Sequence, residues 1–108
     1  MTNEELIAER NEALDKCLSM EQEMGAIGQL PIEVRNILYM VAQEMHRAIM
    51  MYPVMASPHE GWAIVREEVD ELWDEVKKKP SIRSVERMRE EAIQIAAMSC
   101  RFVEDICK

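Results

Sequence analysis

Apolar residues recur along most of the chain at intervals of three, four and seven, which is the spacing of one face of an α-helix. The clearest stripe lies between two prolines and consists of Val34, Ile37, Leu38, Val41, Met45, Ala48 and Ile49. No stretch of the sequence alternates apolar and polar residues in the way that a half-buried strand would. The pattern therefore predicts an all-α fold.

Proline marks the boundaries of the predicted helices, because it lacks the backbone N–H that a helix interior needs. Four segments are separated in this way by Pro31, Pro53, Pro58 and Pro80. The predicted helices span residues 3–24, 31–52 and 58–78, and the fourth begins between Ser81 and Ser84 and continues to Cys107. Gly25 and Gly28 are expected to end the first helix. We predict a four-helix bundle, with residues 1–30 as an N-terminal helix and linker and residues 31–108 as the main domain.

Two helix starts carry capping signals. Thr2 and Glu5 have the spacing of a capping box, in which each side chain bonds the backbone N–H of the other residue. Ser57 is followed by Pro58, a favourable residue in a first helical turn, and then by Glu60 at the same capping distance. These signals predict sharp starts for the first and third helices.

Composition and charge narrow the classes of partner. The chain has 108 residues, 48% hydrophobic content and a formal net charge of −8, without a basic stripe that could follow a phosphate backbone. We therefore expect no nucleic-acid or membrane partner. The acidic N-terminus does not resemble a secretory signal, so we expect a cytoplasmic protein. Cys17, Cys100 and Cys107 show no paired spacing and are expected to be buried, reduced thiols.

Two acidic motifs point to a metal site. Glu67, Glu68 and Glu71 form an EExxE pattern, and Glu91 with Gln94 forms an ExxQ pattern that begins twenty residues after Glu71. Residues three apart in a helix lie on the same face, so each motif presents oxygen ligands together. Facing pairs of this kind would form a cage for a hard divalent cation such as Mg²⁺.

The helical wheel indicates that these glutamates border the core. Glu68 lies about 40° from Leu72 in projection, and Glu91 falls within the broad apolar face of the fourth helix, between Met98 and Phe102. A buried carboxylate needs a cation, a basic partner or a proton. An EExxE pattern by itself is usually a solvated helix face, so the metal hypothesis depends on the two motifs together.

With these motifs the sequence resembles the MazG-like, all-α nucleoside triphosphate pyrophosphohydrolases. The pattern of that family is EExxE followed, after a dozen to thirty residues, by ExxD. The resemblance covers about residues 32–107 and includes the stretch His59–Glu75 and the stretch Glu90–Met98. It is similar to a small subgroup that occurs in bacteria and phages. The first thirty residues carry no motif that we can place.

The resemblance implies an enzyme that uses Mg²⁺, or Mn²⁺ in its place, to hydrolyse a nucleoside triphosphate between its α and β phosphates. It implies a homodimer or homotetramer in which helices of both chains complete the core. The implied metal ligands are Glu68, Glu71 and Glu91, with Gln94 as a neutral ligand where the family has Asp. Glu67 could orient or deprotonate the attacking water, or could be solvated.

Three other side chains are weaker candidates for contact with a substrate. Arg101 is a candidate phosphate ligand, although a surface ion pair is the more common role for an arginine on a helix. Trp62 and Trp73 could stack on a base, but aromatic residues at helical spacing more often lie in a core or an interface.

Three alternatives remain open to different degrees. Gln94 favours a binding or regulatory protein that has kept the fold and lost the chemistry, because one ligand charge is missing. A purely structural helical oligomer would bind no divalent metal. A di-iron bundle is disfavoured, because neither His46 nor His59 follows a glutamate at the required spacing.

Overall fold

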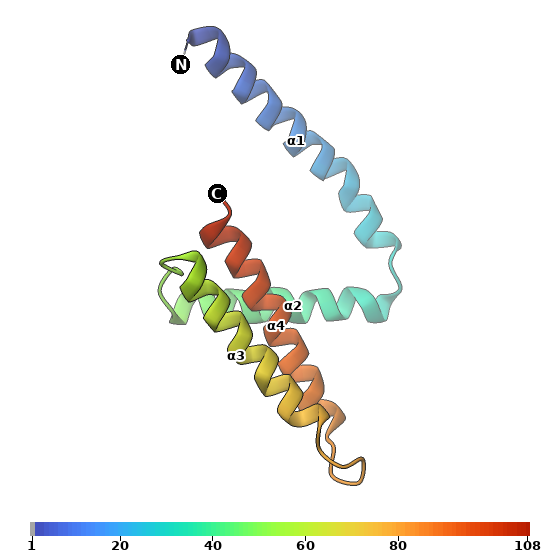
Figure 1. The fold of residues 1–108 in the computed structure, drawn as a ribbon. Coiled ribbons are helices and arrows are strands. Elements are labelled where there is room, and N and C mark those ends of the chain that lie inside the picture. Colours follow the sequence, from blue (N-terminus) through green and yellow to red (C-terminus); the bar gives the residue numbers. More distant parts are fainter. Residues whose placement is uncertain (1) are drawn as a thin grey trace. The chain divides into compact units, whose positions relative to one another are not determined.

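The fold is all-α, as the sequence predicts. This computed structural model describes residues 2–108, without the side chains of residues 13–24. The described residues contain no strand and form four α-helices (Figure 1): α1 (Asn3–Gln29), α2 (Ile32–Met51), α3 (Pro58–Val76) and α4 (Val85–Ile106).

The predicted helix starts are confirmed. Thr2 and Glu5 form a complete capping box at the start of α1. The hydroxyl oxygen of Ser57 accepts a hydrogen bond from the backbone N–H of Glu60, at 3.1 Å, with proline in the first turn of α3. Ser84 caps α4 in the same way. Each cap satisfies a backbone N–H that has no partner within its helix.

The end predicted for the first helix is wrong. The helix α1 does not stop near residue 24 but continues through Gly25 and Gly28 to Gln29. Neither glycine has a positive φ, so both keep ordinary helical geometry at a cost of about 1 kcal/mol each relative to alanine. The C-cap that follows Gln29 is Leu30, whose backbone is extended. Leu30 precedes Pro31, and the helical conformation is unfavourable for a residue that precedes proline.

The chain divides into two compact units, residues 1–35 and residues 36–108. The first contains α1 and the first turn of α2. The second contains the rest of α2 together with α3 and α4, which lie side by side along most of their length (Figure 1). Both acidic motifs belong to this second unit, which therefore determines the geometry of the candidate site.

The core of the second unit lies where α2 crosses the α3–α4 pair. Ala48 and Ala97 have no exposed surface and Met98 is 5% exposed. Around them pack half-buried residues of α2 and α3: Val41, Met45, Ile64 and Val65. The two alanines are small, and the flexible side chain of Met98 packs with them in the same cluster.

Glycine is required at one position of the α3–α4 contact. A Cβ atom built on Gly61 would lie 2.7 Å from Cδ2 of Phe102 and 3.2 Å from the sulfur of Met55. Any larger side chain would therefore force the ring of Phe102 away from the start of α3. This close approach holds the start of α3 and the end of α4 against the loop between α2 and α3.

The broad apolar face of the fourth helix would suit a largely buried helix, but most of α4 is not buried in the described chain. Among the residues of α4 only Ala97, Met98 and Arg101 are buried, whereas Val103 is 61% exposed. The expectation of buried thiols is wrong for Cys100 and Cys107, which are exposed. Cys17 lies outside the residues whose side chains the structure describes.

Other apolar side chains are also exposed. Trp62 and Trp73, expected in a core or an interface, are 57% and 58% exposed and are therefore not in the core of this chain. A short unit with three helices cannot cover the apolar surface of all of them. None of the described helices combines the length and the hydropathy that a membrane span needs.

Candidate metal centre

Three carboxylates converge between α3 and α4. Glu68 and Glu71 lie one turn apart on α3, and Glu91 faces them from α4. One ligand oxygen from each residue lies within 4.8 Å of the other two. We call Glu68, Glu71 and Glu91 the acidic cluster. Its position follows from the side-by-side packing of α3 and α4, which brings the two sequence motifs to the same level.

Two of these carboxylates are incompletely hydrogen-bonded. Glu68 and Glu91 are half-buried, while Glu71 is exposed. The Oε2 atoms of Glu68 and Glu91 are both buried and have no hydrogen-bond partner in the described part of the chain. Leaving a buried polar atom without a partner costs roughly 1–3 kcal/mol. A bound cation or an added proton would therefore stabilise the cluster.

The same crowding changes the acidity of the cluster. Burial raises the pKa of Glu68 to about 7, and the neighbouring Glu71 and Glu91 add to the rise. Burial, followed by the effect of Glu71, also raises the pKa of Glu91. Near neutral pH the metal-free cluster therefore holds a proton that three solvated glutamates would release. A bound divalent cation would replace that proton.

A contrasting glutamate lies one turn further along α3. The carboxylate of Glu75 accepts a hydrogen bond from the ammonium of Lys78 at 2.8 Å, and lies 3.8 Å from the guanidinium of Arg87. Because its charge is already compensated by residues of the chain, Glu75 does not share the demand for a cation seen in the acidic cluster.

A pocket of about 370 Å³ adjoins the cluster. Its lining comes from α2, α3, α4 and the loop after α2: Arg47, Tyr52, Pro53, Glu60, Ile64, Glu67, Glu68, Gln94, Met98 and Arg101. We call it the arginine pocket. Glu68 belongs both to this pocket and to the acidic cluster, and the predicted site residues Glu67 and Gln94 line it as well. A ligand in the pocket would therefore lie beside the cluster.

Arg101 also lines this pocket. It does not form the surface ion pair that is the more common role of an arginine on a helix. It is 3% exposed, and its guanidinium donates a hydrogen bond to the carbonyl oxygen of Pro53 at 2.9 Å. Asp105 lies 3.8 Å away and accepts a hydrogen bond from the backbone N–H of Met55 at 3.0 Å. The surface ion pair is thus corrected to a buried one, which attaches the loop between α2 and α3 to α4.

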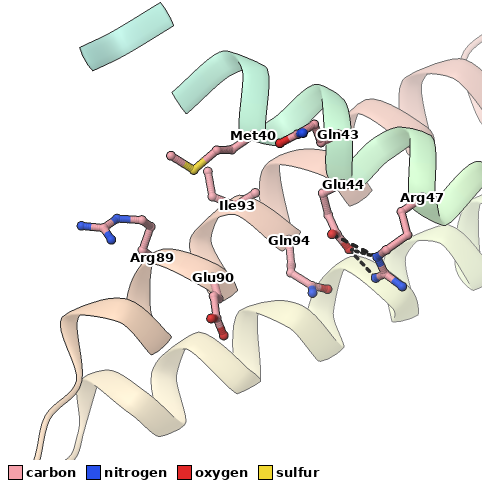
Figure 2. A pocket seen from close by; sticks show the side chains of 8 residues that line it. All are labelled: Met40, Gln43, Glu44, Arg47, Arg89, Glu90, Ile93 and Gln94. Atoms are coloured by element: carbon pink, nitrogen blue, oxygen red, sulfur yellow. Dashed lines mark hydrogen bonds and ion pairs between the residues drawn. The ribbon is translucent and has the colours of Figure 1, made fainter. Parts of the chain in front are cut away.

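Sequence reasoning missed the contribution of α2. Arg47 lines the arginine pocket and also a second pocket of about 310 Å³ between α2 and α4 (Figure 2). We call this second one the α2–α4 pocket; its lining is Met40, Gln43, Glu44, Arg47, Arg89, Glu90, Ile93 and Gln94. The sequence gives no signal for Arg47, because an arginine three residues after Glu44 has the pattern of an ordinary surface ion pair.

Comparison of the chain with protein families, with curated proteins and with solved structures finds no match. The resemblance to the MazG-like enzymes therefore depends on the two motifs and the sequence stretches around them.

Proposed function

We propose that this chain is a cytoplasmic, Mg²⁺-dependent nucleoside triphosphate pyrophosphohydrolase of the MazG-like type. The observation that supports the proposal best is the acidic cluster, where Glu68 and Glu91 each have a buried oxygen without a hydrogen-bond partner in the described chain. A donor set made only of oxygen suits a hard cation such as Mg²⁺ or Mn²⁺. Such an ion would supply the missing positive charge and would polarise a phosphate group.

The residues of the adjoining pocket have complementary roles in this proposal. Glu68, Glu71 and Glu91 would hold the cation, with the amide oxygen of Gln94 as a neutral ligand. Glu67, which is exposed and lines the arginine pocket, would orient the attacking water and accept its proton.

The reaction itself is a hydrolysis at the α phosphorus. The water oxygen bonds to that phosphorus, while the bond from it to the oxygen bridging the α and β phosphates breaks. The bridging oxygen leaves with pyrophosphate, and the other product is a nucleoside monophosphate. In this proposal Arg101, which lines the pocket, would contact a phosphate.

We also propose that the active form is a homodimer or homotetramer that completes a MazG-like bundle. The support is apolar surface on α3 and α4: Trp62, Val69, Trp73 and Val103 are between 40% and 61% exposed. Exposed apolar patches of this kind mark contact surfaces, and a symmetric pairing of identical chains is the commonest way to cover them.

The test is a screen of canonical and damaged nucleoside triphosphates with Mg²⁺ or Mn²⁺, in which released pyrophosphate is measured. We expect the unchanged protein to release pyrophosphate, and Glu68→Gln and Glu91→Gln to reduce the rate by at least about 100-fold, as loss of a metal ligand usually does. Glu104→Gln is the matched control, because this glutamate lies on α4 and is 64% exposed. If the unchanged protein releases no pyrophosphate from any substrate, the proposal is wrong.

A second candidate function is a nucleotide-binding or regulatory protein without hydrolytic activity. The observation that favours it is Gln94, which brings no charge to a position where the resembling family has Asp. In that case Mg²⁺ and a nucleoside triphosphate would raise the melting temperature of the protein, but no pyrophosphate would be released over long incubation.

A further inference from the structure

Arg47 lies at the border of the two pockets. It is one of two residues that line both of them, the other being Gln94. Figure 2 shows its guanidinium turned towards the carboxylate of Glu44, one turn earlier on α2. Nε of Arg47 donates to both oxygens of Glu44 at 3.1 Å, and Nη2 donates to one of them as well.

The two arginines of the arginine pocket are held in different ways. Arg101 is buried, bonds the backbone of Pro53 and has Asp105 as its counter-ion, so its position and charge are fixed. The side chain of Arg47 is 45% exposed, and its partners are side chains on its own helix, Glu44 and the sulfur of Met51. Arg47 can therefore change partners by rotating its side chain, without any movement of the backbone.

The partner of Arg47 is located outside the arginine pocket. Glu44 lines the α2–α4 pocket but not the arginine pocket. The guanidinium of Arg47 is accessible to solvent, although the side chain of Glu44 is only 17% exposed. Phosphate offers an arginine the same forked geometry as a carboxylate, with more negative charge. A phosphate group in the arginine pocket would thus compete well with Glu44 for the guanidinium.

We propose that Arg47 is a phosphate-binding residue that exchanges Glu44 for the phosphates of a polyphosphate ligand in the arginine pocket. The inference deepens the proposed function and rests on it, because it assigns the leaving pyrophosphate portion of the substrate to the space between Arg47 and the acidic cluster. It also gives Glu44 a role as the competitor that occupies Arg47 when the ligand is absent.

Binding of such a ligand depends on the divalent cation. Glu60 and Glu67 line the same pocket, so without a cation their charges oppose the approach of a polyphosphate. With Mg²⁺ at the acidic cluster the balance reverses, and Arg47 adds a second positive group on the side of the pocket formed by α2. The ligand expected to bind is therefore pyrophosphate together with Mg²⁺, and not pyrophosphate alone.

Isothermal titration of the full-length protein with pyrophosphate, in Mg²⁺ and in EDTA, tests the inference. We expect Arg47→Gln to weaken binding in Mg²⁺ by roughly tenfold or more, as loss of one charge-assisted pair does. Glu44→Gln should strengthen it by roughly threefold, because the competing carboxylate is gone. Arg66→Gln is the matched control: this arginine is exposed, pairs with Asp70 on α3 and lines neither pocket.

Three results would overturn the inference: no Mg²⁺-dependent binding of pyrophosphate to the unchanged protein, equal affinities of Arg47→Gln and Arg66→Gln, or a loss of affinity in Glu44→Gln. The last would mean that Glu44 positions Arg47 instead of competing for it. The outcome is separable from that of the proposed function, which is measured by hydrolysis. If pyrophosphate binding depends on Arg47 but no substrate is hydrolysed, the inference holds and the hydrolase proposal is wrong. If Arg47→Gln hydrolyses the substrate with an unchanged KM, the hydrolase proposal holds and the inference is wrong.

Discussion

Replacing Glu68 by glutamine should stabilise the metal-free protein at alkaline pH. The carboxylate of Glu68 has a buried oxygen without a hydrogen-bond partner in the described chain and lies beside Glu71 and Glu91. Glutamine has nearly the same shape, carries no charge, and can donate from its amide N–H₂ to a neighbouring carboxylate. The substitution therefore removes repulsion and satisfies a hydrogen bond without creating a cavity.

The magnitude follows from the pKa of Glu68, which is about 7 in the folded chain against 4.5 for a solvated glutamate. The folded chain keeps this proton up to about pH 7 while the unfolded chain releases it near pH 4.5, so the free energy of unfolding falls as the pH rises between these values. The full shift corresponds to about 3 kcal/mol. Water at the half-exposed cluster screens the charges, which leaves about 1 to 2 kcal/mol.

Thermal unfolding in EDTA, followed by circular dichroism, measures this difference. At pH 8 we expect the melting temperature of Glu68→Gln to exceed that of the unchanged protein by roughly 5 to 10 °C, and the difference to vanish near pH 4.5. Glu67→Gln is the control, because it removes the same charge from an exposed neighbour on α3. A lower melting temperature of Glu68→Gln at pH 8, or an equal gain in the control, would refute the reasoning.

Three further substitutions test the contacts around the site. Gly61→Ala should destabilise the chain by about 1–3 kcal/mol in chemical denaturation, since its Cβ would lie 2.7 Å from the ring of Phe102; an unchanged midpoint would contradict that contact. Asp105→Asn should cost about 1–3 kcal/mol, because it removes the counter-ion of the buried Arg101, and equal stability would show that the pair contributes nothing. Gln94→Asp should tighten Mg²⁺ binding by roughly tenfold in calorimetry, because it adds a charged ligand; weaker binding would place this residue outside the metal site.

The helix boundaries could be predicted where the signal is local. Pro58 after Ser57 starts α3 in the sequence and in the structure alike, because the cap is formed within one turn. The end of α1 could not be predicted from Gly25 and Gly28, since glycine only weakens a helix and does not stop it. Proline at position 31, which acts on the conformation of the residue before it, is the stronger signal.

The site was predictable in its acidic part and not in its basic part. Glu68 and Glu91 could be placed near the core from their positions relative to apolar neighbours on their own helices, which is a periodic property. The burial of Arg101 depends on the carbonyl of Pro53, 48 residues earlier in the chain, and the role that we propose for Arg47 depends on how α2 crosses α4. Both depend on contacts between residues far apart in the sequence, and such contacts produce no periodic pattern.

The contrast between two glutamates of α3 is the strongest physical argument for a diffusible cation. Glu68 and Glu75 lie seven residues apart, on the same face of one helix. The chain compensates Glu75 with Lys78 and Arg87, whereas Glu68 is surrounded by other carboxylates and has a buried oxygen that nothing in the described chain bonds. A lysine near Glu68 would remove the instability, yet it would also occupy the position that a metal ion needs. Stability lost at the acidic cluster is therefore the expected consequence of keeping that position open, and saturating Mg²⁺ should restore it.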